Sequence, residues 1–97
     1  MIAAEVGYSY AASGKKGDAQ KVLRELKDEA ARRYVDPYLI AIIHAGLGEK
    51  DQAFVWLEKA FEERSAWMPW LKVEPKFDGL RSDRRFQDLM RRIGLTP

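Results

Sequence analysis

Two pairs of adjacent carboxylates are the residues of this 97-residue chain best suited to acid–base chemistry. They are Asp28 with Glu29 and Glu62 with Glu63. A glycosidase sets two carboxylates on opposite sides of a cleft, one to donate a proton and one to act as base or nucleophile. Adjacent carboxylates among lysines and arginines instead form the solvent-exposed face of a helix. The sequence therefore predicts no catalytic pair.

His44 is the single histidine, and the chain has no cysteine. A zinc site uses several His or Cys ligands, and the apolar segment around His44 carries no carboxylates that replace them. The string Gly46–Lys50 has neither the preceding strand nor the Ser/Thr of a P-loop. We expect His44 to be a packed side chain, and the chain to be no enzyme and to hold neither metal nor cofactor.

Basic residues gather towards the C-terminus. Residues 72–97 carry seven Lys or Arg against four Asp or Glu, although the net charge of the chain is only +2. The aspartates are interspersed among the arginines, which favours local ion pairs over a nucleic-acid surface. No apolar run approaches the roughly 18 residues that span a bilayer. We expect a cytoplasmic chain that binds neither nucleic acid nor membrane.

Helical periodicity dominates the first 64 residues. Apolar residues recur once per helical turn as far as Gly14. An amphipathic segment then runs from about Asp18 to the Asp36-Pro37 step, a dipeptide that separates helices. The next segment, 37–48, is apolar around most of its circumference, so this helix is expected to be buried on more than one side. A fourth helix opens at Asp51. Two helix pairs in series are predicted, with no competing strand.

The helical periodicity stops after Arg64, and Pro69 and Pro75 interrupt any helix in the following segment. Order returns at Ser82, which is suited to cap a helix. From there Phe86, Leu89, Met90 and Ile93 form a stripe with the spacing of an amphipathic helix. This pattern is typical of the capping helix of a helical array.

The two helix pairs repeat one pattern at a spacing of 34 residues. Ala11 and Ala45, Gly14 and Gly48, Ala19 and Ala53, and Leu23 and Leu57 are each 34 residues apart. Paired helices with this period resemble the tetratricopeptide repeat (TPR), a family that also uses a small residue where the helices of a pair touch. The departures are Leu26, where a small residue is usual, His44 in place of an aromatic residue, and the missing tryptophan early in each unit.

The resemblance implies an all-α fold, a right-handed superhelical stack of antiparallel helix pairs with a C-terminal capping helix. It forms a single domain, with repeat 1 at about 1–34, repeat 2 at about 35–65, and a degenerate third unit with its cap at 66–97. The tail resembles the C-terminal endings of TPR modules in bacterial signalling and regulatory proteins. On this basis we expect a fragment of a larger protein.

In this family the first helix of each pair lines a concave surface that binds peptides. The matching residues here are Ala4, Tyr8, Ala11, Tyr38, Leu39, Ile42 and Ala45. They lack the Lys, Asn and Arg of the members that hold a C-terminal carboxylate. An apolar groove of this kind suits a partner's amphipathic helix or extended hydrophobic segment. The alternative is that Tyr38 and Ile42 pack against the third unit.

Two further surfaces are candidates. Trp67, Met68 and Trp70 form either an exposed anchor for a partner or core beneath the last helix. Ile2 and Val6 lie at the open N-terminal edge, where a second copy would stack or swap a helix to form a homodimer. The expected function is a non-catalytic scaffold that binds another protein or peptide, with self-association as the alternative.

Overall fold

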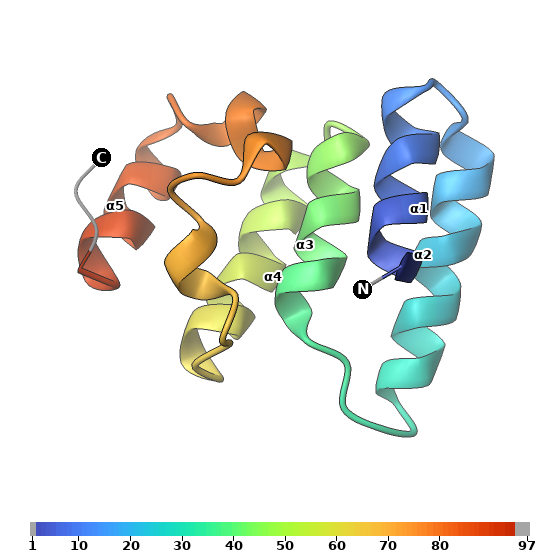
Figure 1. The fold of residues 1–97 in the computed structure, drawn as a ribbon, viewed down its shortest axis with the longest axis horizontal. Helices are drawn as coiled ribbons and strands as arrows, with labels where there is room; N and C mark the ends of the chain where they lie inside the picture. The colour runs from blue at the N-terminus through green and yellow to red at the C-terminus, as the bar shows by residue number, and fades with distance from the viewer. Residues whose placement is uncertain (1, 95–97) are drawn as a thin grey trace.

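The structure, a computed structural model, describes residues 2–94 and within them every side chain except that of Ile2. The described chain is all-helical, as predicted, and contains no strand (Figure 1). Its elements are α1 (Ile2–Ala12), α2 (Lys16–Ala30), α3 (Pro37–Gly46), α4 (Lys50–Glu62), the 3-10 helices η1 (Met68–Trp70) and η2 (Pro75–Leu80), and α5 (Arg84–Arg92). α1 and α2 lie at one end of the long axis, α3 and α4 in the middle, and α5 at the other end.

The turns after α1 and α3 share one geometry. Gly14 and Gly48 have φ angles of +79° and +76°, the left-handed region that favours glycine. In each turn the amide of the following residue donates to the carbonyl five positions earlier, at 2.8 and 3.0 Å. α2, α4 and α5 then begin at Lys16, Lys50 and Arg84, at intervals of 34 residues. The sequence period is therefore also a period of backbone geometry.

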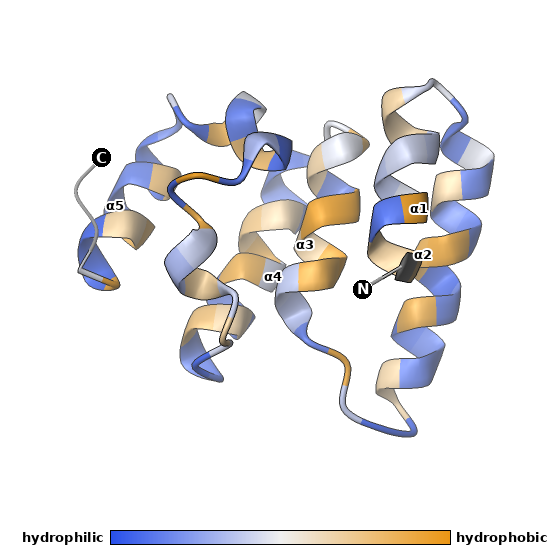
Figure 2. Cartoon of the chain, viewed as in Figure 1, coloured by the Kyte–Doolittle hydropathy of each residue, from blue (hydrophilic) through white to orange (hydrophobic). Residues whose placement is uncertain are grey.

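α3 is the centre of the core. Every residue from Pro37 to His44 is buried, as its continuous hydrophobicity predicted, and α3 is the most hydrophobic helix in Figure 2. One side of α3 packs with α4 and η2, in an apolar cluster that also holds the buried residues of α5, and the other side presents Ile40 and Ile43 to α2. Where α1 crosses α3, a Cβ on Gly7 would lie 2.8 Å from Cδ1 of Ile43. The small residue therefore allows close approach.

The interrupted segment still fills the place beside α3. Pro69 and Pro75 lie in the first turns of η1 and η2, where the missing amide proton costs nothing. η2 packs on α3, and α5 packs on α4 through the buried Phe86, Leu89 and Met90. The predicted cap at Ser82 is wrong: Asp83 caps α5, because its carboxylate accepts the amide of Arg85 at 2.9 Å.

The arginines of the C-terminal tail form local ion pairs, as the interspersed aspartates predicted. Within the tail they join Arg81 to Asp78, Arg85 to Asp83, and both Arg91 and Arg92 to Asp88. Two more join α4 to α5, Asp51 with Arg85 and Glu58 with Arg92, and each spans 34 residues. Among the described residues, no helix combines the length and the apolar character needed to cross a membrane.

Candidate functional site

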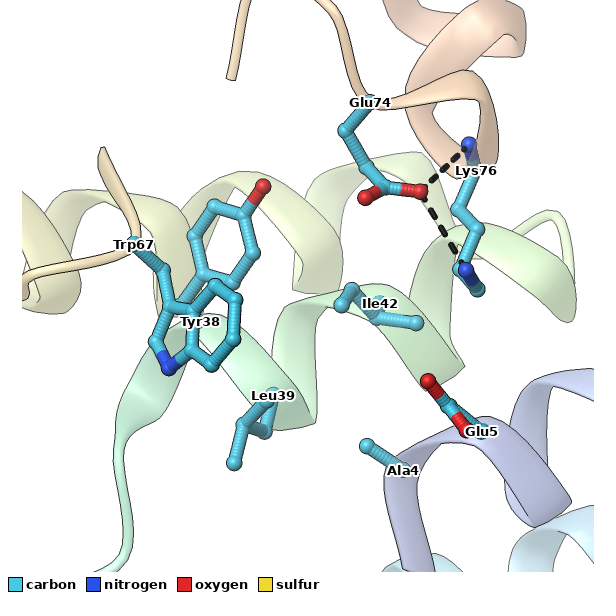
Figure 3. Close-up of a pocket in the computed structure, with 8 residues that line it drawn as sticks. All are labelled: Ala4, Glu5, Tyr38, Leu39, Ile42, Trp67, Glu74 and Lys76. Carbon is cyan, nitrogen blue, oxygen red and sulfur yellow. Dashed lines mark hydrogen bonds and ion pairs between the residues drawn. The ribbon is translucent and has the colours of Figure 1, made fainter. Parts of the chain in front are cut away.

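A small cavity opens between α1, α3 and the segment 66–76, on the face formed by the first helix of each pair (Figure 3). Its volume is about 60 Å³, and we call it the Trp67 cavity. The lining residues are Ala4, Glu5, Tyr38, Leu39, Ile42, Trp67, Glu74 and Lys76. It has an apolar floor and a rim that carries an indole, two carboxylates and an ammonium group.

Trp67 is held in place by a chain of hydrogen bonds that starts at the cap of α3. One carboxylate oxygen of Asp36 accepts the amide of Tyr38 at 3.0 Å, and the other accepts the buried Ser65 hydroxyl at 2.6 Å. The same Ser65 oxygen accepts the amide of Trp67 at 3.2 Å. The Trp67 and Tyr38 rings consequently stack, with centroids 6.3 Å apart and planes at 17°. Asp36 and Ser65 are thus positioning residues.

The opposite rim is built by the start of η2. Glu74 caps this helix by accepting the amide of Lys76 at 3.2 Å, and its carboxylate also pairs with the Lys76 ammonium at 3.3 Å. That ammonium lies 5.6 Å from the centroid of the Tyr8 ring. Arg81 donates to the backbone carbonyls of Lys72 and Glu74 and thereby holds the segment before η2. Glu74 and Lys76 neutralise each other.

Tyr38 lies behind the Trp67 cavity with its hydroxyl buried. That hydroxyl has no hydrogen-bond partner among the described residues, and the ring meets Phe77 edge-on at a centroid distance of 5.4 Å. Burial raises the pKa of Tyr38, and the carboxylates of Glu74 and Asp36 raise it further. The phenol is therefore neutral, and it serves as a packed ring.

The predicted groove residues divide between the cavity and the core. Ala4, Tyr38, Leu39 and Ile42 line the Trp67 cavity but are each less than a tenth exposed. Ala11 is buried away from it, and Tyr8 and Ala45 are partly buried beside the larger core cluster. The groove is therefore mostly filled by its own side chains, as the packing alternative proposed, and it stays hollow only at the cavity.

The predicted anchor residues separate along η1. Trp67 is 43% exposed and Trp70 57%, whereas Met68 is buried in the core, because successive residues of a 3-10 helix point in different directions. Met68 is therefore no part of an exposed anchor. At the N-terminal edge, Val6 is 39% exposed. The prediction for Ile2 lies outside the described side chains.

Three rim residues, Glu5, Glu74 and Lys76, were not predicted. Glu5 directly follows Ala4 on the helix and so lies at the edge of the same face. This adjacency could have predicted it at the rim of the groove. Glu74 and Lys76 flank Pro75 and follow the break in the periodicity, so no helical register connected them to the groove. Only the packing of η2 on α3 brings them there.

The groups considered for catalysis do not meet in the Trp67 cavity. His44 is buried at the end of α3, where its Nδ1 donates to the Glu49 carboxylate at 2.8 Å and its Nε2 has no partner within the described chain. Burial lowers the pKa of His44 more than the bond to Glu49 raises it. Over residues 2–94, no group of three His, Asp or Glu side chains is arranged to hold a metal ion.

Two other hollows lie elsewhere on the surface. One, of about 290 Å³, is lined by Lys72, Arg81, Phe86, Gln87 and Met90. The Arg81 guanidinium in this hollow already donates hydrogen bonds to Asp78 and to two backbone carbonyls, and the two apolar residues, Phe86 and Met90, are buried. The other surrounds the first turn of α4 at Gly48–Gln52 and is polar. Neither combines an exposed aromatic ring with an apolar floor, as the Trp67 cavity does.

The fold and this site define a compact all-helical chain of packed helix pairs with a small apolar cavity on one face. Comparison with protein-family models, with curated proteins and with solved structures gave no match for this chain.

Proposed function

We propose that the chain is a TPR-like array of helix pairs, closed by α5 as the capping helix. The support is a repeated geometry. The turns at Gly14 and Gly48 match, three helices begin 34 residues apart, and the two ion pairs between α4 and α5 join residues one period apart. η2 takes the place of the first helix of the third unit, because it packs on α3 as α1 does.

The function we propose is non-catalytic binding of a segment of another protein on the face of α1, α3 and residues 66–76. The observation that carries this proposal is Trp67, a tryptophan 43% exposed, held in place through Ser65 and Asp36 at the rim of an apolar cavity. A partly exposed aromatic side chain fixed beside a pocket is typical of the residues that dominate binding energy at interfaces. A partner would bury it.

Selection of peptides from a random displayed library against the folded chain tests this function. We expect the selected peptides to lose about tenfold or more in affinity in Trp67→Ala, since a hot-spot truncation costs about 2 kcal/mol or more. Trp70→Ala is the matched control, because Trp70 is also exposed but does not line the cavity. Selected peptides that bind Trp67→Ala as tightly as the parent chain would contradict the proposal.

Self-association is the second candidate function, and the exposure of Val6 on α1 favours it. α1 packs on α2 and α3, and Val6 points away from both core clusters. A second copy stacked there would continue the array and bury this side chain. Light scattering over a range of concentrations should then show a mass that rises towards the dimer and falls back in Val6→Lys. A monomeric mass at every concentration would exclude it.

A further inference from the structure

Several aromatic rings of this chain are covered by one of its own cations. Five rings have a lysine ammonium or arginine guanidinium 4.4 to 5.6 Å from the ring centroid. The pairs are Trp56 with Lys27 and Lys59, Tyr8 with Lys76, Phe54 with Arg85, Phe61 with Arg92, and Phe86 with Arg81. The attraction of a cation to a ring face is strongest for indole. The covered rings are buried or half-buried, whereas the exposed aromatic side chains, Tyr34, Trp67 and Trp70, have no such cation over them.

Of these three exposed residues, Trp67 is the one that lines the Trp67 cavity. One side of its indole is covered by Tyr38, and no cation of the described chain lies over the rest, although the residue is 43% exposed. In Figure 3 the indole stands at one side of the Trp67 cavity, in front of Tyr38. The ring is thus available to a cation from outside the chain.

The charge of the cavity has the matching sign. Glu74 and Lys76 pair with each other, but Glu5 is exposed and forms no ion pair among the described residues. Figure 3 shows Glu5 on α1 on the far side of Leu39 and Ile42 from Trp67. The cavity therefore carries one uncompensated negative charge across an apolar floor from an uncovered indole.

We propose that the Trp67 cavity selects partner segments that insert an arginine or lysine side chain. The aliphatic stem of that side chain packs over Leu39 and Ile42, and its cationic head lies between the Trp67 indole and the Glu5 carboxylate. The small volume, about 60 Å³, suits a slender stem better than a second aromatic ring. This inference rests on the proposed protein-binding function, and it specifies the chemistry of the partner as basic.

Three capped pentapeptides test the proposal: acetyl-Ala-Leu-Arg-Leu-Ala-amide, and the same peptide with citrulline or glutamate in place of arginine. The readout is the indole N–H resonance of Trp67, assigned with Trp67→Phe, during titration of the 97-residue chain. We expect the arginine peptide to bind about three- to tenfold more tightly than the citrulline peptide at low salt, with glutamate weakest. High salt should narrow this difference.

Glu5→Gln tests the contribution of the carboxylate charge to binding, because it removes that charge and keeps the size of the side chain. This substitution should narrow the difference in affinity between the arginine and citrulline peptides to what the Trp67 ring alone provides, whereas Glu62→Gln, which removes an exposed carboxylate that does not line the cavity, should leave their ratio unchanged. Equal binding of arginine and citrulline peptides by the parent chain, both shifting Trp67, would overturn the basic preference but support protein binding at this face. Three peptides that leave Trp67 unshifted would overturn the preference as well, and the library selection then decides the broader function.

Discussion

The Tyr38 hydroxyl is a buried polar group without a partner among residues 2–94, so its removal should stabilise the fold. The residue is 1% exposed. An unpaired buried donor loses its hydrogen bonds to water on folding, which costs about 1–3 kcal/mol. We expect Tyr38→Phe to raise the free energy of unfolding by about 1 kcal/mol or leave it unchanged. Urea denaturation followed by circular dichroism measures this.

Tyr38→Leu is the control, since it also removes the ring that packs against Phe77 and Trp67. This variant should lose about 1–3 kcal/mol through the cavity it leaves. A loss of more than about 1 kcal/mol in Tyr38→Phe would contradict the prediction, because it would mean that the hydroxyl is bonded in solution.

His44 should make the stability of the chain depend on pH near neutrality. Burial holds the pKa of the folded His44 below the ordinary value of 6.5, and the nearby Lys27 lowers it further, against the opposing effect of Glu49. The unfolded chain therefore binds more protons as the pH falls below 6.5, and the free energy of unfolding falls with it. Well above that pH the residue is neutral in both states and contributes no pH dependence.

Urea denaturation between about pH 7.5 and about pH 5 measures this effect. Asp83, whose pKa the hydrogen bonds from Arg85 lower to about 2, loses its contribution only below its ordinary value of 3.8, so the two windows are separate. His44→Phe should flatten the profile above about pH 5. An equally steep profile in that variant would assign the pH dependence to other groups.

Among the elements, α5 is held by apolar contacts more than by its ion pairs. Leu89 is fully buried, whereas the side chains of Glu58 and Arg92 are each about two-fifths exposed. Leu89→Ala should cost about 2–5 kcal/mol in the free energy of unfolding, and Glu58→Gln less than about 1 kcal/mol. Denaturation of both variants, in low and high salt, checks this order. A larger loss for Glu58→Gln would mean that the ion pairs hold α5.

At the same scale, the sequence predicted the regular elements well and the irregular ones poorly. α3 begins at Pro37 as the Asp36-Pro37 step indicated, because a cap and a proline act locally. α2 begins at Lys16, two residues before the acidic Asp18, since the bond from Ala19 N to Lys15 O closes an earlier turn. Residues 66–80 show no helical period in the sequence, and the packing of η2 on α3 is a tertiary contact that no local pattern predicts.

The candidate site was predictable where it lies on periodic helices. By resemblance to the TPR family, Ala4 on α1 and Leu39 and Ile42 on α3 were expected on the first-helix face, and all three line the cavity. The burial of Leu39 and Ile42 followed from the hydrophobicity of α3, but the cavity beside them was not predictable, because its other walls are Trp67 and the start of η2, which come from the segment without a period. The backbone of Trp67 is held by its hydrogen bond to the Ser65 hydroxyl, a contact that the sequence analysis did not predict.

For the molecule as a whole, the two faces of α3 couple the two ends. Tyr38, Leu39 and Ile42 belong to the apolar cluster shared with α4, η2 and α5, whereas Ile40 and Ile43 belong to the cluster shared with α2. The outer helices have neighbours on one side only. In an array whose units contact only their neighbours, stability is a sum of unit and interface terms, so the ends open before the middle.

Hydrogen exchange should therefore rank the helices, with backbone amides of α3 exchanging most slowly and those of α1 and α2 faster, through an opening that leaves α3 and α4 folded. Leu23→Ala in α2 should speed exchange in α1 and α2 most, because Leu23 belongs to the smaller apolar cluster and not to the cluster shared by α3, α4, η2 and α5. Ile42→Ala, which acts on the larger cluster, should speed exchange throughout. Exchange followed by NMR measures each amide separately. If Leu23→Ala increased the exchange rate equally in every helix, the chain would unfold as one cooperative unit. That result would count against the repeat architecture, since its units would then have no separate stability.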